Sequence, residues 1–295
     1  MSSQETLQDG RALANLLRAR TQLFILTGAG CSTDSGIPDY RDEAGNWKRT
    51  PPVTHQDFLR SDAVRQRYWA RSLLGWPVIA QSSPNAAHAA LAALETAGLV
   101  RQIVTQNVDG LHQRAGSQQV IELHGRIGQV ICLDCGALHA RETVQTVLQK
   151  TNPGWSRLQA TTAPDGDADL DRSSTQDFRI PTCANCDGML KPDVVFYGDA
   201  VPRLRVEAAM NALQESDAML VVGSSLSVYS GYRFCLRAQE LGLPILAINQ
   251  GRTRADELFT YKSRQSCTDV LSRIIDELAV GRGTRPTATR HASAG

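Results

Sequence analysis

The chain has 295 residues, of which 42% are hydrophobic and 21% are charged, enough for one large packed domain and a smaller one. The formal net charge is +1, which gives no electrostatic basis for non-specific nucleic-acid binding, so no nucleic-acid partner is expected. No apolar run approaches the roughly 20 residues of a membrane helix, so no membrane association is expected either.

The first half of the chain predicts an alternation of helices and short buried strands. Near the N-terminus, apolar side chains at Leu7, Leu13, Leu16 and Leu17 predict an amphipathic first helix rather than a transit peptide. Asp42–Pro52 is polar and rich in proline, which predicts a mobile loop. The remaining elements expected here are strands at Leu23–Leu26, Val100–Thr105 and Val120–Leu123 and helical segments at His55–Ala80 and Pro84–Ala97.

After Arg126 the alternation of strands and helices is interrupted by a cysteine-containing segment, and it resumes later in the second half of the chain. A CxxC pair comes first, and a second pair follows a polar insert at Asn152–Asp177. The elements expected after Arg126 are helices at Glu142–Lys150, Val201–Glu215 and Thr268–Leu278, a β-like stretch at Asp193–Tyr197, and strands at Ala218–Val222 and Ile245–Ile248. The last residues, Gly281–Gly295, have the composition of a disordered tail.

Strands that alternate with helices predict an α/β fold, a Rossmann-like doubly wound parallel sheet. The cysteine-containing segment interrupts that sheet, which predicts an inserted small zinc-binding domain. The expected division is a discontinuous cofactor-binding domain at 1–34, 98–125 and 191–280, a cofactor loop and helical part of the small domain at 35–97, a zinc-binding module at 126–190, and the tail at 281–295.

A glycine turn follows the first predicted strand. Gly28, Ala29 and Gly30 would let backbone amides approach a pyrophosphate at a helix N-terminus. Such turns also occur without a ligand, and the third glycine of the usual dinucleotide fingerprint is replaced by Thr33. The polar stretch that follows, up to Arg41, favours a ligand site because a fold has no need for so many polar residues there.

A second polar group follows a strand at Gln106, Asn107 and Asp109. An amide and a carboxylate in this position can hold a ribose hydroxyl and a carboxamide. His124 ends the next apolar run, and a histidine can act as a general base near neutral pH. A lone histidine is more often structural, so the residue pattern by itself leaves both interpretations open.

Two CxxC pairs provide four thiols, the donor set of tetrahedral Zn²⁺. They are formed by Cys132, Cys135, Cys183 and Cys186. The separation between the pairs exceeds the roughly 15–20 residues of a compact ribbon, but the polar insert can loop out. Four thiolates would leave no open position, so the predicted site is structural; two unrelated pairs are the alternative. The other three cysteines are scattered, which fits a reducing compartment.

Thr27–Arg41, TGAGCSTDSGIPDYR, and Thr105–Gly125, TQNVDGLHQRAGSQQVIELHG, resemble the signature motifs of the sirtuin (Sir2) family, NAD-consuming protein-lysine deacylases. The resemblance extends from about Leu23 to about Leu278. It implies NAD contacts at Gly28, Ala29, Gly30, Asp39, Tyr40, Arg41, Gln106, Asn107, Asp109, Gly223, Ser224, Ser225, Asn249, Gln250, Gly251 and Cys267.

The resemblance also implies a mechanism. The acyl oxygen of a modified lysine attacks C1′ of the nicotinamide ribose and nicotinamide leaves. This leaves an alkylamidate. His124 then deprotonates a ribose hydroxyl, which attacks the alkylamidate carbon, and water completes the release of free lysine and O-acyl-ADP-ribose. Asn107 would orient the ribose and a water, and Asp109 the nicotinamide amide. His112 has a structural role in the family motif, and Cys31 lies at a variable position, which indicates a small buried side chain rather than a nucleophile.

Three segments bear on the substrate. Val195, Phe196 and Gly198 lie in a stretch that resembles the one whose backbone pairs with the substrate peptide. The stretch around Tyr68 and Arg71, together with the long insert, resembles class II sirtuins, bacterial or mitochondrial. These two residues are spaced like the pair by which class III sirtuins read acidic acyl groups; packing within a helix is the alternative.

The partners implied are acylated-lysine proteins. Mono-ADP-ribosyl transfer and a lipoamidase-type long-chain deacylase are alternative activities. The expected location is the bacterial cytoplasm, with the mitochondrial matrix as the alternative. The oligomeric state is not indicated.

Overall fold

The computed structural model describes residues 3–40, 42, 46, 48, 52–155, 161–162, 168–169 and 175–282. The predicted contact Arg41, most of the predicted loop at Asp42–Pro52, much of the polar insert and the tail beyond residue 282 lie outside these residues. Among the described residues, no helix combines the length and the apolar character needed to cross a bilayer.

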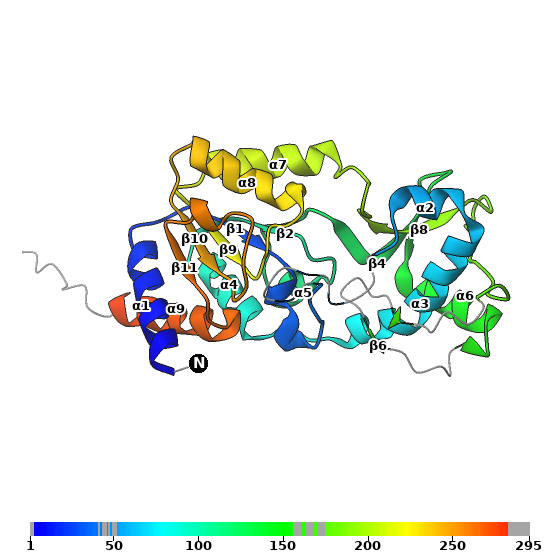
Figure 1. Cartoon of the computed structure of the whole chain (residues 1–295), viewed down its shortest axis with the longest axis horizontal. Helices are drawn as coiled ribbons and strands as arrows, with labels where there is room; N and C mark the ends of the chain where they lie inside the picture. Colours follow the sequence, from blue (N-terminus) through cyan, green and yellow to red (C-terminus); the bar gives the residue numbers. More distant parts are fainter. Residues whose placement is uncertain are drawn as a thin grey trace, which may run out of the picture.

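A parallel six-stranded sheet forms the larger part of the molecule, in the order β11-β10-β9-β1-β2-β3 (Figure 1). Every neighbouring pair in it is parallel. The strands are β1 (Leu23–Thr27), β2 (Val100–Thr105), β3 (Val120–Glu122), β9 (Ala218–Val222), β10 (Ile245–Ile248) and β11 (Tyr261–Ser263). The predicted α/β class and doubly wound parallel sheet are confirmed.

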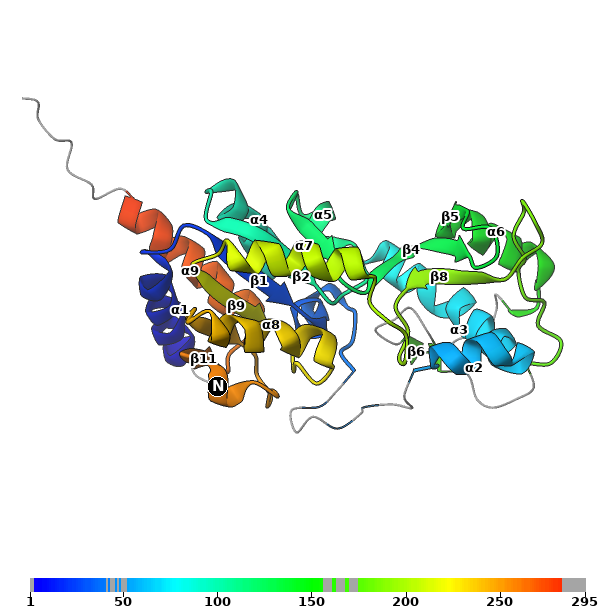
Figure 2. The ribbon, with the colours of Figure 1, turned by 90° about the horizontal axis from the view of Figure 1, so that it is seen from above.

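Helices cover both faces of this sheet, because side chains alternate between the faces along each strand. Leu23 and Ile25 of β1 pack into one cluster, and Phe24 and Leu26 pack into the other. The first face is covered by α1 (Ser3–Leu17), α4 (Ala86–Thr96) and α9 (Cys267–Arg282). The second face is covered by α7 (Arg203–Gln214) and α8 (Tyr229–Glu240), which Figure 2 shows side by side.

A smaller module with its own antiparallel sheet, β5-β4-β8, lies beside the parallel sheet (Figure 1). It contains β4 (Gly125–Cys132), β5 (Leu138–Ala140), β8 (Leu190–Val194), α2 (His55–Arg60), α3 (Asp62–Gln81) and α6 (Arg141–Thr151), with the two-stranded pair β6 (Thr161–Thr162) and β7 (Ala168–Asp169). Its core is a separate cluster that includes Phe58, Trp69 and Phe178. The residue bounds assigned to each domain stay a prediction.

Several elements differ from the sequence expectation. The segment His55–Ala80 is two helices, because Ser61 ends α2 and its hydroxyl caps α3 by accepting from the Val64 backbone N–H. The β-like stretch at Asp193–Tyr197 is β8, which ends at Val194 and pairs with β4 in the small sheet. Helix α8 was not predicted, although Phe234 and Cys235 give it a fully buried face.

The order of the parallel strands reverses between β1 and β9. The chain proceeds outward from β1 through β2 to β3 on one side, and from β9 through β10 to β11 on the other. The connections therefore diverge at the carboxyl ends of β1 and β9, and a crevice opens there. Gly28 follows β1 and Gly223 follows β9, so both glycine turns lie at this point.

Candidate active site

A cavity of about 760 Å³ opens at the crevice between the two glycine turns. It is lined by all the predicted cofactor residues that the structure describes, namely Gly28, Ala29, Gly30, Asp39, Tyr40, Gln106, Asn107, Asp109, Gly223, Ser224, Ser225, Asn249, Gln250, Gly251 and Cys267. His124 and the predicted substrate residues Val195, Phe196 and Gly198 line it as well. One continuous cavity thus collects residues that are far apart in the sequence.

The two glycine turns lie against each other. The Gly30 backbone N–H donates to the Gly223 carbonyl at 2.8 Å, and the Gly28 N–H donates to the Val222 carbonyl at 3.0 Å. A Cβ on Gly223 would lie 2.3 Å from the Cys31 nitrogen, and Gly223 has a φ of +60°. The glycines at these positions therefore allow the two turns to approach each other closely. They also leave space for a ligand.

Asn107 and Asp109 are fixed in one hydrogen-bond network through Ser32. The Asn107 amide donates to the Gly28 carbonyl and to the Ser32 hydroxyl, both at 3.0 Å. The Ser32 hydroxyl donates to the Asp109 carboxylate at 2.8 Å, and the Leu111 backbone N–H donates to its other oxygen at 2.9 Å. Burial raises the pKa of Asp109 above its ordinary value, against the opposing effect of these hydrogen bonds.

Gln106 connects the two sides of the crevice. Its side-chain amide donates to the Ser224 hydroxyl at 2.7 Å, and that hydroxyl accepts from the Leu226 backbone N–H. The Gln106 backbone carbonyl accepts from His124. This residue therefore links the end of β2, the turn after β9 and the imidazole.

His124 is held in one tautomer. Its Nδ1 is 3.0 Å from the Gln106 carbonyl oxygen, which can only accept, so the proton is on Nδ1. The lone pair of Nε2 then accepts from the Ser230 hydroxyl at 2.8 Å. Burial, with smaller contributions from the nearby cations Arg233 and Arg205, lowers the pKa of His124 to about 4, against the raising effect of the hydrogen bond to Gln106. The imidazole is consequently neutral near pH 7, with an unprotonated Nε2 at the cavity.

Three cavity residues that the sequence analysis did not identify complete the site. Ser32 joins Asn107 to Asp109, Ser230 contacts His124, and Arg233 lies on the next turn of α8. The signal for Ser32 was its place in the polar stretch after the glycine turn. The sequence contained no indication of Ser230 or Arg233, because helix α8, on which both lie, was not predicted.

The predicted substrate segment runs past the imidazole. The Val195 backbone N–H donates to the His124 carbonyl at 2.8 Å, and the Gln56 amide donates to the Gly198 carbonyl at 2.8 Å. Tyr68 and Arg71 are not among the residues that line the cavity. Tyr68 is buried behind Phe196, with 5.2 Å between the ring centroids, which matches the packed-helix alternative.

The turn after β10 and the first residue of α9 contain the last of the predicted cofactor contacts. Asn249 follows β10, and its side-chain amide donates to the Gly251 carbonyl at 3.0 Å. Cys267 begins α9, and its thiol donates to the Ile248 carbonyl at 3.6 Å. Burial raises the pKa of this thiol to about 12, so it is a neutral wall residue rather than a nucleophile.

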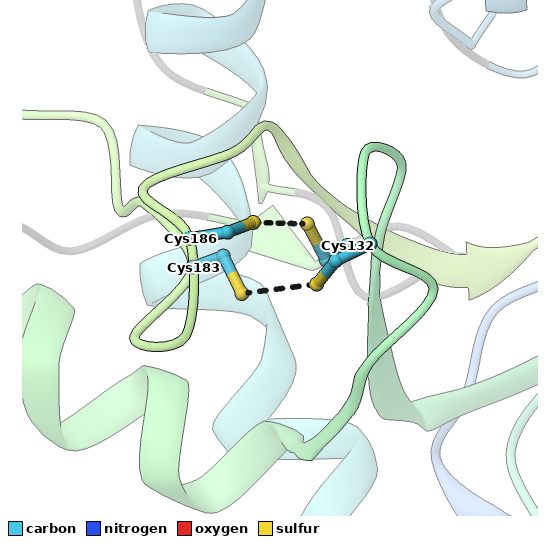
Figure 3. Close-up of side chains that lie close together, drawn as sticks. Cys132, Cys183 and Cys186 are labelled. Atoms are coloured by element: carbon cyan, nitrogen blue, oxygen red, sulfur yellow. Dashed lines mark hydrogen bonds between the residues drawn. The ribbon is translucent and has the colours of Figure 1, made fainter.

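The four CxxC cysteines meet in the small module. The sulfur atoms of Cys132 and Cys186 are 3.6 Å apart, and those of Cys135 and Cys183 are 3.8 Å apart (Figure 3). All four sulfur atoms lie within 4.8 Å of one another, and none forms a disulfide. A tetrahedron with Zn–S bonds of about 2.3 Å has edges of about 3.8 Å, so the donor set fits one structural Zn²⁺.

The low pKa of His124 makes stability depend on pH. The unfolded chain protonates this histidine below its ordinary pKa of 6.5, whereas the folded chain resists protonation down to about 4. Above pH 6.5 the ring is neutral in both states, so its titration costs no stability there. As the pH falls from 6.5 toward 4, protonation of the unfolded chain progressively lowers the free energy of unfolding. We expect His124→Gln to gain about 2 kcal/mol relative to the parent chain between about pH 7.5 and about pH 5. Urea unfolding at both values measures this, and equal pH dependence in the two proteins would contradict it.

Comparisons with known proteins agree with this geometry. The model of the Sir2 family matches residues 28–230. An "NAD-dependent protein deacetylase" from Xanthomonas campestris is 56% identical over 265 residues, covering 90% of each chain. The bovine "NAD-dependent protein lipoamidase sirtuin-4, mitochondrial" is 48% identical, covering 90% of this chain and 85% of its own. A solved structure described as "Sir2-p53 peptide-NAD+" has a TM-score of 0.74 and 30% identity, covering 91% of this chain and 98% of its own.

Proposed function

The chain belongs to the Sir2 family, and we propose that it is an NAD-dependent protein-lysine deacylase that transfers the acyl group to ADP-ribose. The site assignment rests on the neutral His124, which lines the same cavity as the two glycine turns, Asn107 and Asp109. Its unprotonated Nε2 accepts a hydrogen bond from the Ser230 hydroxyl. The names of the bacterial relatives and the NAD and peptide in the similar solved structure support this activity.

The residues present fit NAD. The glycine turns form a cradle that a Cβ would fill, since one on Gly28 would lie 2.8 Å from the Ser224 Cβ. Gly28 and Gly30 would hold the pyrophosphate, and Asn249 the adenosine ribose. The bound cofactor supplies an electrophilic ribose carbon with nicotinamide as the leaving group. Asp109, which lines the cavity, would accept a hydrogen bond from the nicotinamide amide.

His124 would be the general base. Its Nδ1–H donates to the Gln106 carbonyl, which fixes the ring and leaves Nε2 to accept a proton from a ribose hydroxyl. The Ser230 hydroxyl occupies the position next to Nε2 and would be replaced there by the ribose hydroxyl. Asn107 would orient the ribose and a water, because its amide is anchored to Gly28 and Ser32.

The acylated substrate would enter along Val195–Gly198. These residues line the cavity next to His124, and an extended peptide can pair with such a segment as an added strand. Phe196 would contact the acyl-lysine side chain. Tyr68 would act on acyl choice from behind Phe196, through the packed aromatic rings, and Arg71 is proposed to act with it because the two residues share one face of α3. The name of the bovine relative supports testing lipoyl chains beside acetyl.

Nicotinamide release from NAD tests the proposal directly. We expect release to require an acyl-lysine peptide, because the peptide supplies the attacking oxygen. The assay uses unmodified, acetyl, glutaryl and lipoyl peptides on the parent chain, and Arg71→Met tests whether the acyl ranking changes. Release without an acyl peptide, with label passing from NAD to protein, would instead indicate mono-ADP-ribosyl transfer.

The location is proposed to be the bacterial cytoplasm. All seven cysteines are free thiols in the structure, which fits a reducing compartment. Fractionation of the native host with detection of the chain would test this. Recovery with an organelle or an envelope fraction would contradict it.

A further inference from the structure

A buried group of one thiol and two imidazoles lies directly beneath the glycine turn. Cys31, His88 and His112 are 1%, 0% and 1% exposed. The Cys31 sulfur and one nitrogen from each ring lie within 4.8 Å of one another. The residues come from three different elements: the turn helix η1 (Ala29–Cys31), the first turn of α4 and the short helix α5 (Leu111–Arg114). None of them has a role in the reaction proposed above.

Each imidazole has one nitrogen engaged and the other without a partner. His112 Nε2 is 2.9 Å from the Thr27 hydroxyl, which donates to the Thr105 hydroxyl, so the proton on this ring is on Nε2. Its Nδ1 therefore has a lone pair, and no hydrogen-bond partner reaches it. His88 Nδ1 accepts from the Asn85 backbone N–H at 3.3 Å and lies 3.0 Å from the Asn85 side-chain oxygen, and its Nε2 also lacks a partner. Buried nitrogens without partners are rare and need an explanation.

We propose that Cys31, His88 and His112 form a second metal site, which takes a thiophilic ion such as Zn²⁺ through the thiolate, His88 Nε2 and His112 Nδ1. One thiolate and two imidazoles are a common donor set for such ions. The outer nitrogens already have neighbours that fix the orientation of both rings: Asn85, through its backbone N–H and its side-chain oxygen, at His88 Nδ1, and the Thr27 hydroxyl at His112 Nε2. A water or an exogenous group would take the fourth position.

The charges around the site favour a cation. Burial lowers the pKa of His88 to about 4 and that of His112 to about 3, so both rings are neutral and able to ligate near pH 7. Burial and the neighbouring Cys267, Asp109 and Asp34 raise the pKa of the Cys31 thiol, because another negative charge is unfavourable there. A bound cation offsets both effects, and the thiol proton is released to solvent.

A metal bound by Cys31, His88 and His112 would affect the position of the first glycine turn, Gly28–Gly30. Cys31 directly follows Gly30, and its carbonyl accepts from the Asn85 amide at 2.9 Å, at the N-terminus of the helix that contains His88. Coordination of the sulfur would fix the turn relative to α4 and α5. We therefore expect the metal to change the KM for NAD more than the KM for the acyl peptide.

Cobalt titration tests the proposal on protein that contains one zinc per chain, held by the four-cysteine cluster. The variant is Cys31→Ala, and Cys235→Ala is the matched control because both thiols are buried. We expect the parent chain and the control to bind one Co²⁺ with a thiolate-to-cobalt absorption band, while the zinc of the four-cysteine cluster is retained. Cys31→Ala should lose the cobalt and the band. His112→Gln provides a second variant that leaves the thiol in place.

Two results would overturn the proposal. One is the absence of Co²⁺ or Zn²⁺ binding beyond the four-cysteine cluster, with only a water between the imidazoles in a crystal structure of metal-soaked protein. The other is equal uptake by the parent chain and Cys31→Ala. These experiments measure metal content, absorption and the crystal structure, so their outcome does not depend on the proposed deacylase activity.

Discussion

Replacement of His124 by glutamine is expected to abolish deacylation while leaving the fold intact. The glutamine amide can still donate to the Gln106 carbonyl and accept from the Ser230 hydroxyl, the two hydrogen bonds that His124 makes. It cannot take up a proton at neutral pH. Loss of a general base typically costs about 10²- to 10⁴-fold in rate, and we expect the formation of deacylated peptide to fall by that factor.

The controls for this variant separate chemistry from binding. The thermal midpoint at about pH 7.5 should stay close to that of the parent chain, because His124 contributes no protonation effect there. NAD binding should be retained, since the two glycine turns are unchanged. Ser230→Ala removes only the hydroxyl next to Nε2 and should leave most of the rate. A His124→Gln protein that is folded and still forms deacylated peptide at a comparable rate would refute the assignment of the base.

Replacement of Cys183 by serine is expected to have the largest effect on stability. This cysteine is 0% exposed in the core of the small module, and His139 Nε2 lies 3.4 Å from its sulfur. Serine is a much weaker zinc ligand, and structural zinc contributes on the order of several kcal/mol to folding. The variant should lose one zinc per chain, and the small module should unfold.

Zinc content and proteolysis measure this loss. The matched control is again Cys235→Ala, a buried thiol on α8 far from the four-cysteine cluster in sequence, which should retain the zinc. The substrate segment follows β8 directly, so unfolding of the module should also disorder Val195–Gly198 and stop deacylation. A Cys183→Ser protein with its full zinc content and an unchanged thermal midpoint would show that the cluster is not a structural site.

The sequence was sufficient for five of the six parallel strands because their signal is local, but the edge strand β11 (Tyr261–Ser263) has no apolar run and was not predicted. Each of the five is a short apolar run followed by a glycine or polar turn, a pattern that buried parallel strands produce. The positions of Gly28, Gln106, Gly223 and Asn249 at the cavity follow from the same rule, since the carboxyl ends of parallel strands meet at one edge. The four cysteines could also be recognised in advance, because their spacing within each pair is local.

The features that the sequence could not provide depend on which elements pack together. The tautomer and low pKa of His124 result from burial against Gln106 and Ser230, and Ser230 is 106 positions away in the chain. The position of Tyr68 behind Phe196 was undecided from helical spacing, because spacing shows which residues share a face but not what that face meets.

The sequence by itself therefore determined the fold class, the cofactor turns and the four-cysteine ligand set, all of which are encoded in contiguous motifs. The tertiary structure alone decided the protonation state of His124, the hydrogen-bond partners of Val195 and Gly198, and the meeting of Cys31, His88 and His112 under the first glycine turn. The physical reason is that desolvation and hydrogen-bond geometry arise from contacts between distant segments, which no local pattern specifies.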